Sequence, residues 1–298
     1  MMKIISSKDL EQIKNNYNKE LNKFKYQILV CSGAGCVSSN SNDVKNAFAD
    51  EILKNNLTGD VKIIETGCMG ICAVGPLALI LPDRTFYTAL TPETARNIVK
   101  SHIIGGEIVT ENTFYAHTLN KYIPKIDDID FFREQVKITL RNCGVMEYGN
   151  IDAYIAREGY LAAFEALHNK SSMDVINELM KAGLKGRGGA GFPTAKKWLA
   201  GYNAKSEIKY LVCNADEGDP GAFMDRSILE GDPHTVIEGM IIGGYAIGAS
   251  SGYVYIRAEY PIAVERLSAA IKQAYGLGLL GKNIMGSEFS FDLEIRIG

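Results

Sequence analysis

Four of the six cysteines in this chain of 298 residues lie in the first quarter of the sequence. They form two pairs, Cys31 with Cys36 and Cys68 with Cys72, spaced as C-x4-C, a gap of 31 residues, and C-x3-C. Each pair lies in a glycine-containing loop, "CSGAGC" or "CMGIC", after a run of strand-forming residues. In a protein that we expect to be cytoplasmic, four thiolates favour a metal centre over disulfides. The glycines let backbone amides approach and hydrogen-bond to the sulfurs of a cluster. We predict a [2Fe–2S] cluster; zinc, which prefers C-x2-C pairs, and buried packing are the alternatives.

A second candidate site is the stretch "GLKGRGGAGFPTAKKW", residues 183–198, with five glycines in its first nine positions. Gly186, Gly188 and Gly191 match the pattern G-x-G-x-x-G. A dinucleotide motif of that kind must follow a strand, whereas a predicted helix precedes this one. We therefore interpret the stretch as a loop whose backbone lies against a flat ring or a phosphate, with Arg187 and the pair Lys196 and Lys197 as cationic groups. A loop packed on another backbone is the alternative.

Two further stretches carry polar and aromatic groups at the ends of predicted strands. "CNADEGDPGAFMDR", residues 213–226, contains Asn214, Asp216, Glu217 and Asp219. "YVYIRAEYP", residues 253–261, contains Tyr255, Glu259 and Tyr260. Such groups suit ribityl or ribose hydroxyls and an aromatic ring, since α/β sheets bind ligands beyond the carboxyl ends of their strands. A solvated acidic turn and an ordinary strand end are the alternatives.

Three regions of different pattern must position these residues. Residues 1–104 are predicted to form one compact domain, with helices at 9–24, 42–55 and 92–103 and strands at 26–31, 61–66, 77–82 and 85–90. Residues 105–170 are predicted to be a helical connector that packs on the next domain. Residues 171–298 alternate strands at 209–214, 252–260 and 289–297 with helices at 171–183, 232–249 and 261–276. This alternation predicts an α/β domain with a largely parallel sheet. Because the chain stops directly after a strand, we expect this domain to be incomplete at its C-terminus.

The bulk composition argues against several classes of partner. The formal net charge is −3, and 46% of the residues are apolar. This charge gives no electrostatic reason to expect nucleic-acid binding. The N-terminus has no signal-peptide core and no apolar run is long enough to span a bilayer, so we expect a cytoplasmic protein without direct membrane insertion.

The first region resembles the thioredoxin-like [2Fe–2S] ferredoxins over residues 24–104. By that resemblance, Cys31, Cys36, Cys68 and Cys72 are the cluster ligands. The spacing of the cysteines, the two glycine-containing loops and the order of the predicted elements all agree with this family. The fold class implied is a thioredoxin-like [2Fe–2S] domain followed by an α/β FMN- and NADH-binding domain.

Residues 130–298 resemble the flavin-binding, NADH-oxidising subunit of complex I and its relatives. Those relatives include the diaphorase subunits of NAD(P)-linked or electron-bifurcating iron hydrogenases and of formate dehydrogenases, and "EGDPGAF" is more similar to the hydrogenase branch. The resemblance implies an FMN and nicotinamide site formed by Gly186, Arg187, Gly188, Gly189, Phe192, Lys197, Asn214, Asp216, Glu217, Asp219, Tyr255, Glu259 and Tyr260. Within it, Phe192 is expected on the nicotinamide side. A [4Fe–4S] cluster is expected only in a C-terminal part that these 298 residues do not contain.

The activity implied is that of a diaphorase module. NAD(P)H gives a hydride to FMN, and electrons then pass singly to iron–sulfur clusters, without a catalytic side chain. The implied partners are a hydrogenase or other catalytic subunit and a small [2Fe–2S] subunit. The alternative is a non-enzymatic electron-transfer or assembly subunit that uses only the N-terminal cluster.

Overall fold

The computed structural model describes residues 3–298, which divide into two compact units. Unit 1 comprises the residues up to Asn16, Gly149–Leu229 and Pro233–Gly298. Unit 2 comprises Tyr17–Tyr148 and the short segment Glu230–Asp232. Each unit is therefore assembled from segments that lie far apart in the sequence.

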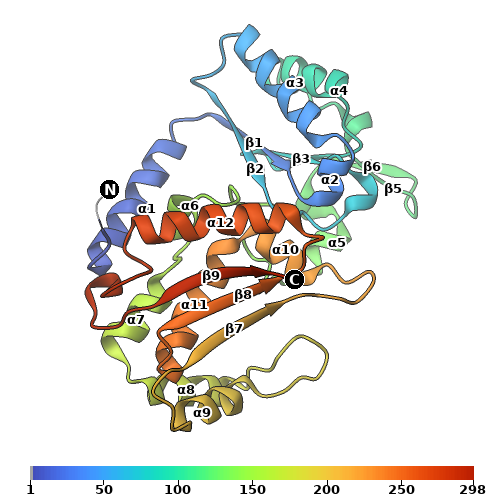
Figure 1. Cartoon of the computed structure of the whole chain (residues 1–298). Coiled ribbons are helices and arrows are strands. Elements are labelled where there is room, and N and C mark those ends of the chain that lie inside the picture. Colours follow the sequence, from blue (N-terminus) through green and yellow to red (C-terminus); the bar gives the residue numbers. More distant parts are fainter. Residues whose placement is uncertain (1–2) are drawn as a thin grey trace. The chain divides into compact units, whose positions relative to one another are not determined.

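Unit 2 contains a four-stranded sheet with the strand order β2-β1-β3-β4 (Figure 1). The strands are β1 (Tyr26–Cys31), β2 (Val61–Thr66), β3 (Ala78–Leu81) and β4 (Thr85–Tyr87). The helices are α2 (Ala34–Ser38), α3 (Ser41–Lys54), α4 (Pro92–Ile98), which continues as a π-helix over Val99–Ile104, and α5 (Asp130–Arg133). Strand β1 is parallel to β2 and antiparallel to β3, and β3 and β4 form an antiparallel hairpin. The predicted order β-α-β-β-β-α is confirmed.

Strand β1 has apolar residues on both of its faces, and each face packs into a different core. Ile28 and Val30 lie in the core that includes residues of α3 and α4. Leu29 and Cys31 point the other way and share a core with Met69 of the second cysteine loop. Successive side chains of a strand point to opposite faces, so a continuous apolar run is what a strand buried on both sides requires.

The stretch after residue 104, expected to be helical, begins with strand pairing. Strands β5 (Phe114–Ala116) and β6 (Lys121–Ile123) form an antiparallel pair. Isolated bridges from Tyr87 to Thr113 and from Thr85 to Lys125 join the residues next to this pair to β4. This part of the chain therefore extends the fold of unit 2.

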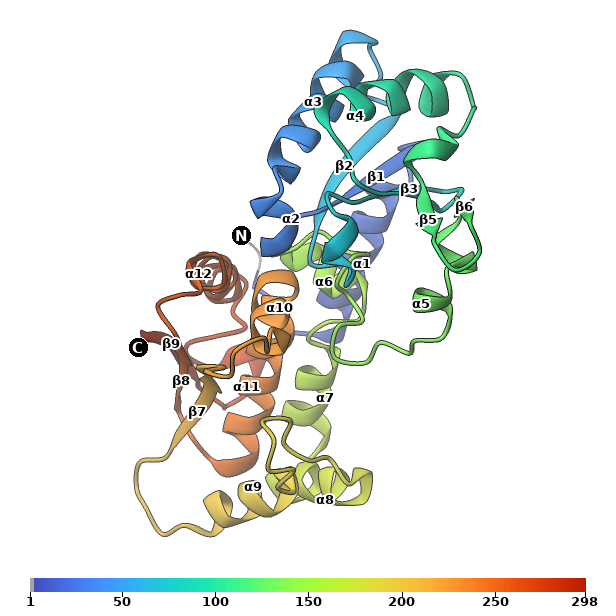
Figure 2. The same ribbon diagram turned by 90° about the vertical axis from the view of Figure 1, so that its right-hand side faces the viewer.

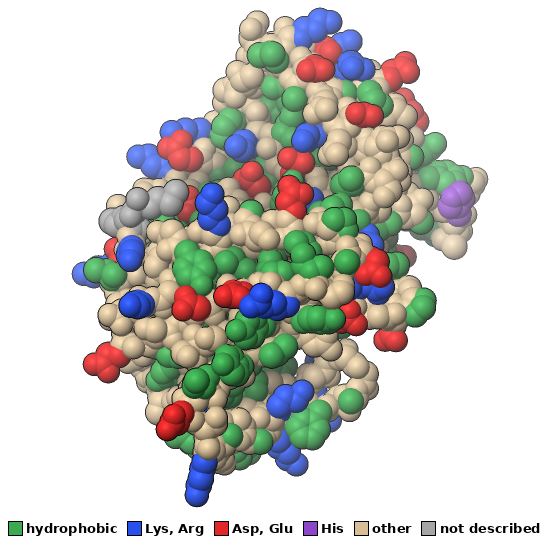
Figure 3. Space-filling view, in the orientation of Figure 1, with side chains coloured by type: hydrophobic (Ala, Val, Ile, Leu, Met, Phe, Trp, Pro, Cys, Tyr) green, Lys and Arg blue, Asp and Glu red, His purple; other side chains and the backbone are tan. Residues whose placement is uncertain are grey.

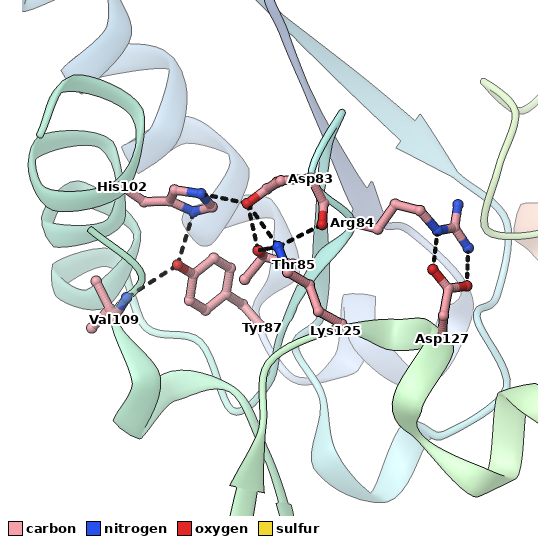
Figure 4. Close-up of polar contacts among 8 residues, drawn as sticks. All are labelled: Asp83, Arg84, Thr85, Tyr87, His102, Val109, Lys125 and Asp127. Atoms are coloured by element: carbon pink, nitrogen blue, oxygen red, sulfur yellow. Dashed lines mark hydrogen bonds and ion pairs between the residues drawn. The ribbon is translucent and has the colours of Figure 1, made fainter. Parts of the chain in front are cut away.

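A partly buried polar network supports this attachment (Figure 4). The Tyr87 hydroxyl and His102 Nδ1 are 2.9 Å apart, and His102 Nε2 lies 2.8 Å from the Asp83 carboxylate. Lys125 Nζ donates to the Asp83 main-chain oxygen at 2.6 Å. Burial alone would raise the pKa of Asp83, but hydrogen bonds from Thr85 and Lys125 and the nearby His102 lower it below its usual value. The network thus joins β4, the π-helix and the segment before α5.

Unit 1 is built on a parallel sheet with the strand order β7-β8-β9. The strands are β7 (Tyr210–Ala215), β8 (Ser251–Ile256) and β9 (Asp292–Ile297). The helices are α1 (Ser7–Leu21), α6 (Ile151–Ala156), α7 (Leu161–Asn169), α8 (Ser172–Ala182), α9 (Thr194–Asn203), α10 (Met224–Gly231), α11 (Pro233–Ile247) and α12 (Pro261–Gly276). The last residues of α1 and of α10 belong to unit 2. The predicted parallel sheet is confirmed, and the carboxyl ends of its strands meet at one edge.

Helix α11 is the centre of the core of unit 1. Ten of its fifteen residues are buried. Its Gly-Gly pair allows close packing, since a Cβ on Gly243 would lie 2.9 Å from Leu211 and a Cβ on Gly244 would lie 2.6 Å from the Phe291 ring. Across residues 3–298, no helix, α11 included, combines the length and the apolar character needed to cross a membrane.

The opposite face of the same sheet is exposed over much of its area. Tyr210, Val212 and Tyr255 are 55%, 61% and 41% exposed, and they alternate with the better-covered residues of their strands. A hollow of about 450 Å³ on this face is lined by Val212, Tyr253, Tyr255 and Arg296. In Figure 3, hydrophobic side chains gather on unit 1 among charged ones on the face toward the viewer.

The N-terminal segment is an integral part of unit 1. Ile4 is 1% exposed, and its backbone N–H donates to the Leu277 carbonyl at 2.8 Å. Lys14 of α1 lies 3.4 Å from the Glu158 carboxylate. The residues before Asn16 therefore add to the packing of α12 and of the segment after α6.

Candidate functional site

The two cysteine loops leave the sheet of unit 2 side by side. Strands β1 and β2 are parallel neighbours, with Cys31 opposite Thr66 in the register, so the loops that follow them start at the same sheet edge. Cys31 and Cys36 are buried, Cys68 is half-buried and Cys72 is exposed. The loops therefore place one pair of thiols in the interior and the other pair nearer to solvent.

The four sulfur atoms form one group. The thiols of Cys68 and Cys72 are 3.7 Å apart. The pKa of Cys31 is raised to about 11, first by its hydrogen bond with Cys36, against an opposing contact with Cys68. The pKa of Cys36 is lowered, chiefly by the same contact with Cys31. Two loops that are separated by 31 residues in the sequence thus bring their thiols into mutual contact.

Glycines of one loop lie directly against cysteines of the other. A Cβ on Gly33 would lie 2.8 Å from the Cys68 Cβ, and a Cβ on Gly35 would lie 3.1 Å from the Cys72 sulfur. These distances leave no room for a side chain at Gly33 and little at Gly35. The glycines of "CSGAGC" are therefore required for the approach of the second loop.

The thiol group fits a two-iron cluster. Within the described part of the chain, no three His, Cys, Asp or Glu side chains surround one metal-ion position. A [2Fe–2S] cluster requires two thiolates at each iron, which the two cysteine pairs can provide. Of the remaining cysteines, Cys143 is buried, and burial raises its pKa to about 12, while Cys213 in β7 is half-buried.

The glycine loop of unit 1 joins α8 to α9 and is closed at its base. Gly186 N–H donates to the Phe192 carbonyl at 2.9 Å, and Thr194 N–H donates to the Leu184 carbonyl at 2.9 Å. Gly189 and Gly191 have φ values of +100° and +61°, which glycine adopts at little cost. A Cβ on Gly188, Gly189 or Gly191 would meet no atom within 4 Å. The glycines are thus not explained by packing within the chain, and the loop leaves its backbone accessible to a ligand.

The predicted strand-end residues lie at the carboxyl edge of the sheet of unit 1. Asn214 of β7 is opposite Tyr255 of β8 in the register. The Asn214 side-chain oxygen accepts from the Asp216 N–H at 3.1 Å. The loop 216–223 and the glycine loop both project toward the side of this edge, as Figures 1 and 2 show. Asn214, Asp216, Tyr255 and the glycine loop are therefore all oriented to the same side of unit 1.

Glu217 is engaged with the chain itself. Its carboxylate accepts from the N–H groups of Asp225 and Arg226 at 2.9 and 3.1 Å, in the first turn of α10. The Tyr260 hydroxyl donates to the same carboxylate at 3.2 Å. An acceptor at a helix N-terminus satisfies otherwise unpaired amides, so Glu217 fixes the start of α10 and the loop before it.

Two arginines that are not among the predicted site residues complete this group. Arg226 and Arg257 lie over the Tyr260 ring, at 5.6 and 5.3 Å from its centroid. Arg257 also forms an ion pair with Glu259 at 3.1 Å and donates to the Glu217 main-chain oxygen at 2.9 Å. Arg257 lies two residues before Glu259 in "YIRAEYP". Its position next to two predicted site residues, Glu259 and Tyr260, is the sequence feature that could have identified it.

The remaining predicted residues are exposed on loops or on α9. Phe192 is 51% exposed, and Lys197 Nζ lies 5.9 Å from the centroid of its ring. Arg187 is exposed on the glycine loop, and Asp219 is exposed in a turn that its main-chain oxygen closes with Ala222. These side chains are accessible to a ligand.

Comparison with known proteins assigns both regions. Residues 14–102 match the family model of the thioredoxin-like [2Fe–2S] ferredoxins, and residues 179–297 match the model of the Nuo51 FMN-binding domain.

Individual relatives cover part of the chain. The NADP-reducing hydrogenase subunit HndC of Solidesulfovibrio fructosivorans is 54% identical over 166 residues, which are 56% of this chain and 34% of the relative. A subunit of the NADH-quinone oxidoreductase of Escherichia coli is 46% identical over 149 residues, or 50% of this chain and 34% of the relative. The chain spans about one third of the length of these curated relatives.

A likeness to a solved structure extends over nearly the whole chain. It is to an NAD+-reducing [NiFe]-hydrogenase, with 22% identity and a TM-score of 0.44, and covers 99% of this chain and 49% of that one. The family matches confirm the resemblance expected from the motifs and the predicted cofactors. The chain therefore contains one region that matches the thioredoxin-like [2Fe–2S] ferredoxin model and a second region that matches the Nuo51 FMN-binding domain model.

Proposed function

We propose that this chain is the NAD(P)H-oxidising diaphorase module of a multisubunit oxidoreductase. The observation that carries the proposal is the presence, in one chain, of a convergent four-thiol group and an open glycine loop, each inside the matching family domain. When bound, FMN supplies hydride acceptance and one-electron release, which the 20 amino acids do not offer. The chain then has to bind, orient and separate the reactants.

In unit 1, the chain's own groups provide a polar and cationic setting for a flavin phosphate and a dinucleotide. Arg187 and Lys197 are exposed cations next to the accessible backbone of the glycine loop. Asn214 and Asp216 offer hydrogen-bonding groups for hydroxyls at the strand ends. Glu217, fixed on the amides of α10, holds the loop that presents Asp216 and Asp219. We assign Phe192 to the nicotinamide side, because its half-exposed ring can stack on a second ring.

In unit 2, we propose that Cys31, Cys36, Cys68 and Cys72 hold the [2Fe–2S] cluster. Cys31 and Cys36 are buried, which would exclude water from one side of a bound cluster, while Cys72 is exposed. Burial and hydrogen bonding at the sulfurs set the reduction potential of such a cluster.

The partners are a further part of the proposal. The names of the relatives refer to a hydrogenase that reduces NADP and to an oxidoreductase that links NADH to quinone. We propose a hydrogenase or other catalytic subunit and a small [2Fe–2S] subunit as the electron-transfer partners of this chain. Either nicotinamide nucleotide is compatible with the residues described.

The proposal is tested with the purified chain after anaerobic reconstitution with iron, sulfide and FMN. We expect bound flavin, a [2Fe–2S] EPR signal after reduction, and reduction of an artificial dye by NADH or NADPH. Arg187→Ala should weaken FMN binding about tenfold to a hundredfold, which corresponds to one lost charge-assisted hydrogen bond. Lys205→Ala, a change to an exposed lysine in the loop after α9, is the matched control.

The second candidate function is electron transfer or assembly without nicotinamide chemistry. The four-thiol group is formed by unit 2 alone, so a cluster does not require an occupied flavin site. An EPR-active cluster in a chain that binds neither FMN nor NAD(P)H would establish this candidate and reject the first.

A further inference from the structure

A three-residue segment, Glu230–Gly231–Asp232, lies among the cysteine loops of unit 2 although it is 158 residues beyond Cys72 in the sequence. It joins α10 to α11. The Glu230 carboxylate accepts from the Ala34 N–H at 3.1 Å. Ala34 is inside the first cysteine loop, two residues before Cys36, and Glu230 is 4% exposed. A buried carboxylate is thus bonded directly to the loop that carries two of the four thiols.

The segment approaches the second cysteine loop at backbone distance. A Cβ on Gly67, the residue before Cys68, would lie 2.5 Å from the Gly231 Cα. A Cβ on Gly231 would lie 2.5 Å from the Cys143 sulfur. Neither glycine has a positive φ, so it is the close approach that requires a residue without a side chain. The segment is therefore fitted between both cysteine loops and Cys143.

A second buried carboxylate holds the segment in place. Asp232 is 1% exposed and accepts from Asn142 Nδ2 at 2.7 Å. Burying a carboxylate costs free energy unless hydrogen bonds compensate it, and both carboxylates of the segment have donors. The Asn142–Asp232 contact helps to secure the position of the segment, and Glu230 is the carboxylate that contacts the first cysteine loop.

We infer that Glu230 is a positioning residue for the [2Fe–2S] cluster, which fixes the first cysteine loop and holds the reduction potential of the cluster low. The inference rests on the proposed cysteine ligands. A reduced cluster carries one more negative charge than an oxidised one, and a nearby negative charge in a poorly solvated region opposes that addition. Because the carboxylate is buried, salt screens its effect only weakly.

The test is a potentiometric EPR titration of the reconstituted full chain and its Glu230→Gln variant. Glutamine keeps a side-chain acceptor for the Ala34 N–H but removes the charge. We expect a positive shift of the midpoint potential, equivalent to a tenfold or greater change in the ratio of reduced to oxidised cluster at a fixed potential, or 59 mV for one electron. The shift should persist when the salt concentration is raised.

Glu51→Gln is the matched control. Glu51 belongs to the same unit and is 4% exposed like Glu230, but it contacts Asn55 and Lys100 rather than a cysteine loop. We expect the wild-type potential in this variant. An unchanged potential in Glu230→Gln, or an equal shift in Glu51→Gln, overturns the inference while the proposed function stands.

Two further measurements keep the test decisive. Iron and sulfide contents are measured in Glu230→Gln and in Glu230→Asp, which retains the charge. One contrary outcome is that neither variant holds a cluster, and another is that only the aspartate variant does. In either case the carboxylate is needed for cluster assembly, and the effect on the reduction potential that we assign to it is rejected. If the wild-type chain itself forms no [2Fe–2S] signal, the proposed ligand set fails and the inference fails with it.

Discussion

The two glycine-rich regions of this molecule use glycine for opposite physical reasons. In the cysteine loops of unit 2, the space beside Gly33 is already filled by the backbone and Cβ of Cys68. In the α8–α9 loop of unit 1, the space beside Gly188, Gly189 and Gly191 is open to 4 Å. The cysteine loops are thus packed tightly against each other. In the α8–α9 loop, by contrast, no packing within the chain requires a residue without a side chain.

The two candidate sites therefore differ in how far they are organised before a ligand binds. The thiols of unit 2 already contact one another, so the site that we propose for the cluster is largely preformed. The glycine loop is fixed only at its base, by the hydrogen bonds of Gly186 and Thr194. A ligand of unit 1 must therefore supply contacts that the loop lacks, and the following substitutions test the contrast.

The largest effect is expected for Gly33→Ala. A Cβ placed 2.8 Å from the Cys68 Cβ forces the two cysteine loops apart, and overpacking of this kind costs about 3 kcal/mol. We expect cluster content below about one tenth of the wild-type value, a loss comparable to that in Cys68→Ser, because a tenfold loss requires only about 1.4 kcal/mol. Iron and sulfide analysis measures the content. FMN binding should be retained in both variants, and its loss would show that the two sites are not independent.

Away from the glycine loop, the interior of unit 1 is expected to exclude water, and buried His234 tests this. Burial lowers the pKa of His234 to about 4 from an ordinary value of 6.5. The unfolded chain therefore binds a proton below pH 6.5 that the folded chain does not take up until about pH 4. The stability contributed by neutral His234 is full at pH 7 and falls with decreasing pH, by about 2 kcal/mol at pH 5.

Urea unfolding of the full chain at the two pH values measures this change. Trp198, the only tryptophan, lies in unit 1 and reports its unfolding. His234→Gln should remove most of the pH dependence, whereas His117→Gln, at an exposed position in unit 2, should leave it unchanged. Equal slopes in all three proteins would mean that the interior around His234 is open to water.

A smaller effect is expected for Gly188→Ala. Its Cβ points into open space and its φ is not positive, so the free energy of unfolding should change by less than about 0.5 kcal/mol. FMN affinity should fall about tenfold, because the methyl group occupies the space in which we place the ligand. Fluorescence titration with FMN measures the affinity. A substantial loss of stability with unchanged affinity would make this loop a packed one, as the cysteine loops are.

The smallest effect is expected for Phe192→Ala. The half-exposed ring contributes roughly 1 kcal/mol of stacking, so the KM for NAD(P)H should rise about fivefold while FMN content is retained. Phe223→Ala, at a residue with a similar exposed fraction in the 216–223 loop, is the control. An equal loss of FMN would place Phe192 in the flavin site instead.

Strands with continuous apolar runs and capped helices were predictable from the sequence. The strands at 26–31 and 61–66 and the helix at 261–276 begin and end as predicted. Helix α10 was not predicted, because glycine and proline before it suggest a long turn and its start depends on the Glu217 carboxylate. The β5–β6 pair was not predicted either, since strands of three residues carry too little periodicity.

The candidate sites, like the fold, were predictable from the sequence only in part. The spacing of the cysteines predicts a metal centre, and the family matches confirm the cofactor, while the ligand residues stay a prediction. Nothing in the sequence indicated that Glu230 reaches Ala34, because that contact depends on the packing of Gly231 against Gly67. Long-range contacts of this kind leave no local pattern in either of the segments that form them.

The discontinuous composition of both units has a consequence for biosynthesis. A chain is made from its N-terminus, so the cysteine loops leave the ribosome well before Glu230, and Ile4 leaves it well before Leu277. In the nascent chain, the Ala34 amide and Gly67 therefore lack their contacts with Glu230 and Gly231 until those residues have been made. The final packing around the two cysteine loops must therefore wait for residues that are synthesised long after the cysteines themselves.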